Sequence, residues 1–159
     1  MIKKISDERG FVSHIMKIND ENYRKLVSIW EIYASCCYPG KIKGWHYHTK
    51  MDMVYTCVSG MVQIAYAEGP EPSTYAYAGA IGSRLAGRNQ YPAREDFKTV
   101  FIGDQNYDQV FIPHGTWNAF RAIGEKPAII INVTNMVHDP QEILRQADNL
   151  FNYKWDYHT

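Results

Sequence analysis

The feature that most constrains the fold is a succession of short runs rich in β-branched and aromatic residues, separated by glycine, proline and asparagine. About nine such runs follow one another at intervals of about ten residues, as strands of an all-β domain do. This pattern favours an antiparallel barrel or sandwich over an α/β fold. Strands are expected at residues 11–18, 26–37, 42–48, 53–58, 61–67, 97–102, 108–112, 117–123 and 128–134.

Four segments depart from this pattern. Residues 19–25 are expected to form a turn and one short helical turn, and residues 73–96 an irregular excursion over the mouth of the barrel. A short C-terminal helix is expected to begin near Asp139 and Pro140, which suit a first turn, because apolar residues then recur at helical spacing. The aromatic tail at residues 152–157 is expected to dock on the sheet.

Composition limits the possible partners. The chain has 159 residues, which favours one domain over 1–159, and its 17 basic residues balance 17 acidic ones. Global charge therefore favours neither nucleic acid nor a membrane surface as a partner. The three cysteines are odd in number, and the N-terminus lacks the apolar core of a secretory signal. Buried, reduced thiols and a cytoplasmic location are expected.

Two histidines stand one residue apart in the run Lys43-Gly-Trp-His-Tyr-His48. Side chains alternate along a strand, so His46 and His48 share a face and converge on one volume if that face looks into a barrel. The simplest interpretation is that they fill a polar interior. A functional interpretation makes them a base or metal ligands, with the carboxylate of Asp52 available to orient His46.

The motifs around these residues resemble the cupins. His46-Tyr-His48, Asp52 and Gly60 resemble the first cupin motif, and residues 111–120 resemble the second. Four stretches are similar in order and spacing to the dTDP-4-dehydrorhamnose 3,5-epimerase branch of that superfamily. They are Asp7-Glu-Arg-Gly-Phe11, Lys43-Gly-Trp-His-Tyr47, residues 104–113 and Asn118-Ala-Phe120, within a similarity that spans roughly residues 5–136.

The resemblance implies a metal-independent isomerase whose fold is a cupin-type antiparallel jelly roll. It implies a nucleotide-linked 4-keto sugar, such as a dTDP-sugar, made for a surface polysaccharide or glycoside. A histidine removes the proton next to the ketone and a tyrosine returns one on the opposite face; His46 falls at the base position. Lys43 stands where an arginine meets the pyrophosphate. A homodimer that exchanges its N-terminal strand is expected, with Arg9 carried to the partner's pocket.

Several family positions are altered in this chain. The acid tyrosine should fall close to Ile131, where only Ile129-Ile-Ile-Asn132 occurs, and a lysine that polarises the ketone should fall near Met53. The histidine of the second motif is replaced by Asn118, and a glutamate that contacts the base is replaced by His14. The acid, the enolate stabiliser and the nucleotide base are therefore left open.

The predicted site combines catalytic and substrate-binding residues. Its catalytic members are His46, Asp52 and Tyr55, the last as a candidate for the missing acid. The predicted substrate-binding residues are Arg9, Phe11, Lys43, Trp45, His48, Gln109, His114, Trp117 and Asn118. The two tryptophans are offered as stacking surfaces, although core packing is the commoner role. The arginines at 84, 88 and 94 form either a solvated face or a charged mouth.

Two alternatives remain at the level of sequence. A metal-dependent cupin, an isomerase or oxygenase, would bind zinc, iron or manganese through His46, His48 and Asp52, with His114 as a replacement for the ligand lost at Asn118. A non-catalytic sugar-binding cupin would have lost its chemistry with the acid. Asn118 argues against a complete metal shell and favours proton transfer without a cofactor.

Overall fold

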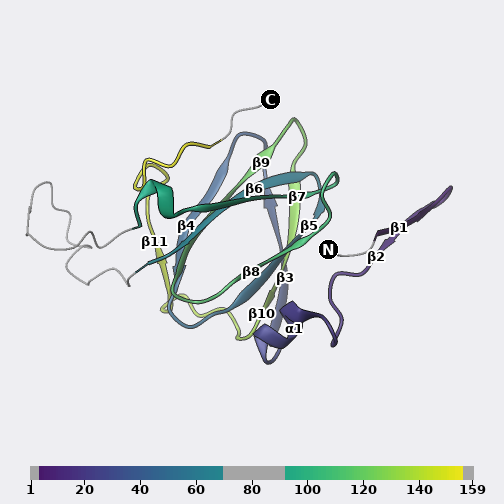
Figure 1. Cartoon of the computed structure of the whole chain (residues 1–159), viewed down its shortest axis with the longest axis horizontal. Helices are drawn as coiled ribbons and strands as arrows, with labels where there is room; N and C mark the ends of the chain where they lie inside the picture. The colour runs from purple at the N-terminus through teal and green to yellow at the C-terminus, as the bar shows by residue number, and fades with distance from the viewer. Residues whose placement is uncertain (1–3, 70–91, 156–159) are drawn as a thin grey trace, which may run out of the picture.

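Two antiparallel sheets packed face to face form the body of the computed structural model, which describes residues 4–69 and 92–155 (Figure 1). One sheet has the strand order β3-β10-β5-β8 and the other β11-β4-β9-β6-β7. The elements are β1 (Lys4–Asp7), β2 (Gly10–Ser13), α1 (Glu21–Leu26), β3 (Glu31–Cys37), β4 (Ile42–His48), β5 (Met53–Ser59), β6 (Met61–Glu68), β7 (Lys98–Gly103), β8 (Gln109–Ile112), β9 (Thr116–Ile123), β10 (Ala128–Thr134) and β11 (Ile143–Arg145). This is the predicted jelly roll.

The strand predictions are confirmed in the body of the chain. The bounds of β4 and β10 are as expected, and β5 to β9 begin or end within one residue of the predicted runs. The short helical turn is confirmed as α1. At the N-terminus the prediction is wrong: the strand expected at 11–18 ends at Ser13, and the strand expected at 26–37 begins only at Glu31.

The predicted C-terminal helix is wrong. The segment after Pro140 instead forms β11, which pairs antiparallel with β4. Directly after β11, Gln146 exchanges two main-chain hydrogen bonds of 3.1 and 3.0 Å with Trp45 of β4. The edge of β4 offers hydrogen-bond partners to the backbone N–H and C=O groups of this segment. This pairing is more favourable than a short helix that would pack against no other element.

The principal core lies between the two sheets and consists of alternate side chains of their strands. It includes Met53, Tyr55, Cys57, Ile64 and Ile130. The tight turn after β5 depends on Gly60, whose φ is 75° and where a Cβ atom would stand 2.7 Å from the carbonyl oxygen of Pro127. The alternation that builds this core also decides which polar side chains face inward.

An aromatic cluster covers the outer face of the five-stranded sheet. Trp45 and Trp117 are fully buried there against Phe151, Tyr153 and Trp155. The docked tail is thereby confirmed up to residue 155; residues 156 and 157 lie outside the described residues. The cysteines are free, and two of the three are buried; the expectation is wrong for Cys36, which is exposed.

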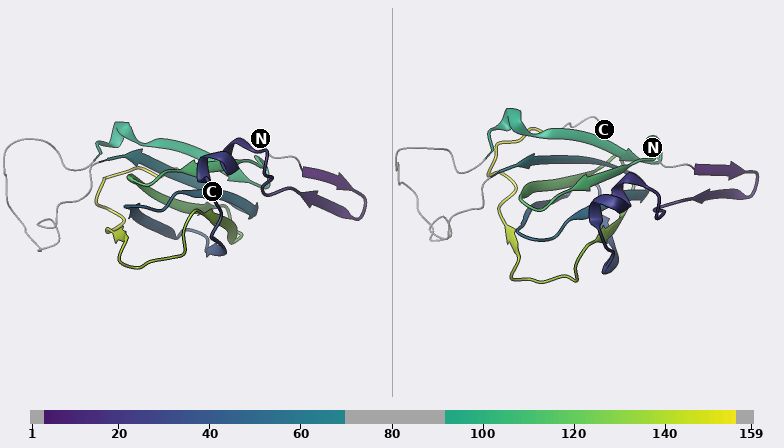
Figure 2. Two further views of the ribbon diagram at one scale, coloured as in Figure 1. Left: turned by 90° about the horizontal axis from the view of Figure 1, so that it is seen from below. Right: turned by 60° about the horizontal axis from the view of Figure 1, so that its bottom comes forward.

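The hairpin of β1 and β2 projects away from the two sheets (Figure 2). Among the described strands, each of these two pairs only with the other. The predicted excursion at 73–96, with Arg84 and Arg88, falls mostly outside the described residues, and its end forms a single 3-10 turn at Arg94–Asp96. None of the helices in the described part of the chain has the length and apolar character needed to span a membrane.

Candidate active site

A cavity of about 490 Å³ opens between the two sheets. The four-stranded sheet supplies one wall from β3 and β5, and the facing wall comes from β4, β9 and β11. A further residue comes from the segment before β11. The lining residues are Glu31, Tyr33, Ser35, Tyr55, Lys43, His46, His48, Phe120, His138, Ile143 and Arg145.

Strand β4 carries the predicted histidines into this cavity. The alternation after Trp45 turns Trp45 and Tyr47 outward into the aromatic cluster and His46 and His48 inward. A register shift between Lys43 and His46 places the lysine on the same wall. Gly44 makes this possible, because a Cβ atom there would stand 2.2 Å from that of Ala119. The predicted convergence of the two histidines is confirmed.

His46 is a neutral imidazole at physiological pH. Its pKa is lowered from 6.5 to about 4, chiefly by burial and in smaller part by the positive charges of the nearby His48, Arg145 and Lys43. Its neighbours across the sheet are Asn118 on β9 and Arg145 on β11. An imidazole held in this form has a lone pair available to accept a proton.

His48 has a different partner. Its Nδ1 is bonded to the carboxylate of Glu142, and both side chains are almost completely buried. Burial lowers the pKa of His48, and the hydrogen bond and charge of Glu142 oppose that shift. With Nδ1 engaged, Nε2 is the nitrogen through which His48 can exchange a proton with a ligand.

Glu142 is itself fixed by main-chain donors. Its second carboxylate oxygen accepts hydrogen bonds from the amides of Lys50 and Met51, at 3.2 and 3.4 Å, and its carbonyl accepts from the amide and hydroxyl of Thr49. Glu142 was not among the predicted site residues, because the sequence placed it in the expected C-terminal helix. The sequence has no local signal for this role, because Glu142 meets His48 only when β11 pairs with β4.

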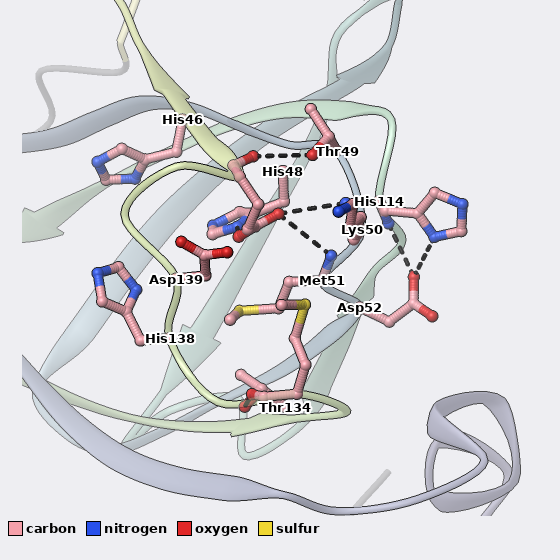
Figure 3. A network of polar contacts seen from close by, with 12 residues as sticks. His46, His48, Thr49, Lys50, Met51, Asp52, His114, Thr134, His138 and Asp139 are labelled. Atoms are coloured by element: carbon pink, nitrogen blue, oxygen red, sulfur yellow. Dashed lines mark hydrogen bonds and ion pairs between the residues drawn. The ribbon is translucent and has the colours of Figure 1, made fainter.

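Asp52 does not have the predicted role beside His46. Its carboxylate accepts hydrogen bonds from the amide and ring Nδ1 of His114, both 2.8 Å, and from the side chain of Asn135 at 2.9 Å. In Figure 3 Asp52 and His114 lie together on one side, away from His46, His48 and His138. This pair ties the start of β5 to the turn before β9.

The predicted metal set is not brought together either. Because Asp52 is bonded to His114, it does not converge with His46 and His48. Within residues 4–69 and 92–155, no group of three histidine, cysteine or carboxylate side chains has the arrangement of a metal site. The replacement ligand proposed at His114 points to Asp52 and is more than half exposed.

Tyr55 lines the cavity as predicted, but its hydroxyl is already used. It donates a 3.0 Å hydrogen bond to Oδ1 of Asn118, and both residues are buried. The amide of Asn118 in turn donates to the carbonyls of His46 and Thr116, at 3.3 and 3.4 Å. Asn118 therefore braces Tyr55 and β4 from behind the cavity and is not among the residues that line it.

The sequence analysis missed the wall built by β3. Glu31, Tyr33 and Ser35 alternate inward along this strand. Asn132 on β10 has Tyr33 and Tyr55 as its cross-strand neighbours on either side. A period-two alternation of polar residues on an otherwise apolar strand was the signal that could have found this wall.

The predicted substrate-binding residues are divided by the structure. Lys43 and His48 line the cavity, and the exposed Arg145, which was not predicted, adds a second cation at its opening. Trp45 and Trp117 are fully buried in the outer cluster, so the prediction that they stack on a ligand is wrong. Met53, where a lysine was sought, belongs to the core.

Three further predicted residues lie away from the cavity in this chain. The Arg9 side chain is 81% exposed in the β1–β2 hairpin and forms a 2.6 Å ion pair with Asp7. Phe11, on the same hairpin, is exposed beneath the ammonium group of Lys4. Gln109 is bonded to Asn22 and to the carbonyl of Ile15, so it fastens the N-terminal segment to β8.

Several proteins to which this chain is similar have names from sugar biosynthesis. No protein-family model matches the chain. A spore coat polysaccharide biosynthesis protein of Bacillus subtilis, SpsL, is 29% identical over 147 residues, which cover 89% of this chain and 80% of that protein. The crystal structure of a dTDP sugar isomerase from Desulfovibrio desulfuricans G20 superposes with a TM-score of 0.74 at 23% identity, covering 99% of this chain and 87% of that one.

A third protein extends the comparison. NovW of Streptomyces spheroides, described as a 4-keto-6-deoxy sugar epimerase, superposes with a TM-score of 0.73 at 16% identity, over 99% of this chain and 72% of its own. The chain therefore shares its fold with these two proteins and with a dTDP-4-dehydrorhamnose 3,5-epimerase from Sulfolobus tokodaii. Within this epimerase-like fold, the cavity lies between the sheets and is lined by His46.

Proposed function

We propose that the chain is a nucleotide-sugar epimerase or isomerase. It would remove a proton from a carbon next to the ketone of a 4-keto sugar carried on a nucleoside diphosphate. The observation that carries this proposal is His46, a partly buried imidazole that lines the cavity and whose pKa of about 4 keeps it in the proton-accepting form.

The chemistry requires no cofactor. When the base takes the proton, the electron pair of the C–H bond is delocalised onto the ketone oxygen as an enolate, and protonation of the same carbon completes the reaction. Lys43 and Arg145 supply positive charge toward which the diphosphate would lie, with the sugar directed inward to His46. The relative weakness of a base with a pKa near 4 is offset by its fixed position.

The similar proteins support the choice of substrate. One is called a dTDP sugar isomerase, one a 4-keto-6-deoxy sugar epimerase, and one takes part in spore coat polysaccharide biosynthesis. We infer a dTDP-linked 4-keto-6-deoxyhexose as substrate, in the supply of activated sugars for a polysaccharide. Free cysteines fit a cytoplasmic location for this step.

The direct test is to incubate the full chain with a panel of dTDP-linked 4-keto-6-deoxyhexoses, including dTDP-4-keto-L-rhamnose, and to identify products by NMR. A new epimer or keto isomer is expected, and His46→Asn should reduce its rate by at least about 100-fold. His114→Asn is the matched control, because His114 lies outside the cavity. Full activity in His46→Asn would contradict the proposal.

We also propose a homodimer in which the β1–β2 hairpin lies on the partner. Ile5, Phe11 and Val12 are exposed on it, at 48%, 55% and 61%. A hairpin that pairs with no other described strand is marginally stable alone. The edge strand β3, with Ile32 exposed on its outer face, is the type of surface that such a hairpin covers. Arg9 would then approach the partner's cavity.

A further inference from the structure

Inversion at a carbon imposes a geometric condition on this cavity. A proton must leave from one face of the sugar ring and another must arrive on the opposite face, so the two groups that exchange protons stand on opposite sides of the ring. His46 and His48 both project from β4 in the five-stranded sheet. The wall opposite them is formed by the four-stranded sheet, where the second group is expected.

Four side chains of that sheet line the cavity, and three of them are poorly suited to donate. Glu31 accepts a 2.7 Å hydrogen bond from the amide of His138 through its carboxylate, and a carboxylate has no proton to give. The hydroxyl of Ser35 accepts from Asn132 at 3.3 Å and is a very weak acid. The hydroxyl of Tyr55 donates its proton to Asn118.

Resting on the proposed epimerase function, we propose that Tyr33 of β3 is the proton donor on the wall opposite the histidines. Its side chain is half-buried and lines the cavity. Within residues 4–69 and 92–155, its hydroxyl has no hydrogen-bond partner among protein groups. The packed sheets stand about 10 Å apart, which leaves room for a sugar ring between the two walls.

The surroundings of Tyr33 keep it protonated. Burial raises its pKa above 10, and the negative charges of Glu31 and Glu142 raise it further. The hydroxyl therefore carries its proton throughout the physiological range. The enolate formed by His46 is a strong enough base to take that proton, because the carbon it restores is a far weaker acid than a phenol.

The proton balance of the step is complete without another reactant. The imidazole of His46 gains the proton from the carbon next to the ketone, and the electrons of the broken C–H bond form the enolate. The Tyr33 O–H bond then breaks, its proton joins the opposite face of that carbon, and the ketone is restored. Solvent returns a proton to the phenolate and accepts one from the imidazolium after the product leaves.

The test uses full-length Tyr33→Phe in heavy water with dTDP-4-keto-L-rhamnose and the other sugars of the panel. The Phe variant is expected to keep its melting temperature, because the lost hydroxyl has no partner. Formation of the inverted product should fall by about 100-fold or more. Solvent deuterium should still enter the recovered substrate with its configuration retained, since His46 can return a proton to the face it came from.

Two comparisons make the result decisive. Tyr38→Phe, an exposed tyrosine just beyond β3, is the matched control and should behave as the unmodified chain. Tyr55→Phe is the rival assignment: if it, and not Tyr33→Phe, separates exchange from inversion, the proposal is overturned. Equal inversion in Tyr33→Phe and the unmodified chain overturns it as well. Absence of exchange in the unmodified chain with every sugar would instead contradict the epimerase function on which it rests.

Discussion

At the scale of single residues, His46 and His48 are separated by their surroundings. They stand two positions apart on one strand and line one cavity, yet only the ring of His48 is hydrogen-bonded to a buried carboxylate, that of Glu142. Burial and neighbouring positive charges lower the pKa of His46, so its imidazole is neutral at physiological pH. One is therefore suited to accept a proton, and the other is held in a fixed tautomer and orientation.

Glu142→Gln tests that orienting role. The amide oxygen can still accept from the amides of Lys50 and Met51, but the NH2 group would face Nδ1 of His48 and force the other tautomer. We expect a fold near that of the unmodified chain and a kcat lowered by about 10- to 100-fold.

Three measurements support the interpretation of that variant. Glu142→Asp should recover part of the lost kcat, because a carboxylate is restored, and the pH profile of kcat should shift in Glu142→Gln. Glu125→Gln, at an exposed turn, is the control. A Glu142→Gln enzyme with unchanged kcat and an unchanged pH profile would show that Glu142 only supports the fold.

At the scale of elements, period-two alternation made the sheets and one wall of the site predictable. The run from Ile42 to His48 fixed both the bounds of β4 and its inward histidines. The C-terminal segment was mispredicted because β11 is formed by pairing with a strand about a hundred residues earlier, which leaves no local signal. Glu142 was missed for the same reason, and Asp52 was assigned to His46 because sequence proximity does not reveal that it faces His114.

The projecting hairpin gives the prediction at this scale. Removal of residues 1–13 deletes β1 and β2, which pair only with each other among the described strands, so the sheets should remain folded. We expect the full chain to be a dimer and the shortened chain a monomer, as measured by light scattering after size-exclusion chromatography. A shortened chain that is still dimeric would contradict hairpin exchange.

At the scale of the whole molecule, the buried histidines make stability depend on pH. The folded pKa of His46, about 4, lies below the ordinary value of 6.5, so the unfolded chain binds the additional proton between these values. The free energy of unfolding should be level above about pH 7 and should fall as pH is lowered. The contribution of His46 is about 2 kcal/mol between pH 7.5 and pH 5.

Urea unfolding at the two pH values measures this dependence. His46→Asn should remove a large part of the fall, whereas the control His114→Asn, at an exposed position, should retain it. The pKa of His48 is lowered in the same direction, so some pH dependence is expected to remain in His46→Asn. Equal pH dependence in His46→Asn and the unmodified chain would contradict the assignment of a neutral His46 with a lowered pKa.

The central claim is that His46 removes a proton next to the ketone of a nucleotide-linked sugar. The most direct measurement follows deuterium from heavy water into that carbon of a dTDP-linked 4-keto-6-deoxyhexose by NMR. Rapid incorporation is expected with the unmodified chain, and a rate at the uncatalysed background is expected with His46→Asn. Incorporation at the same rate in both proteins would contradict it.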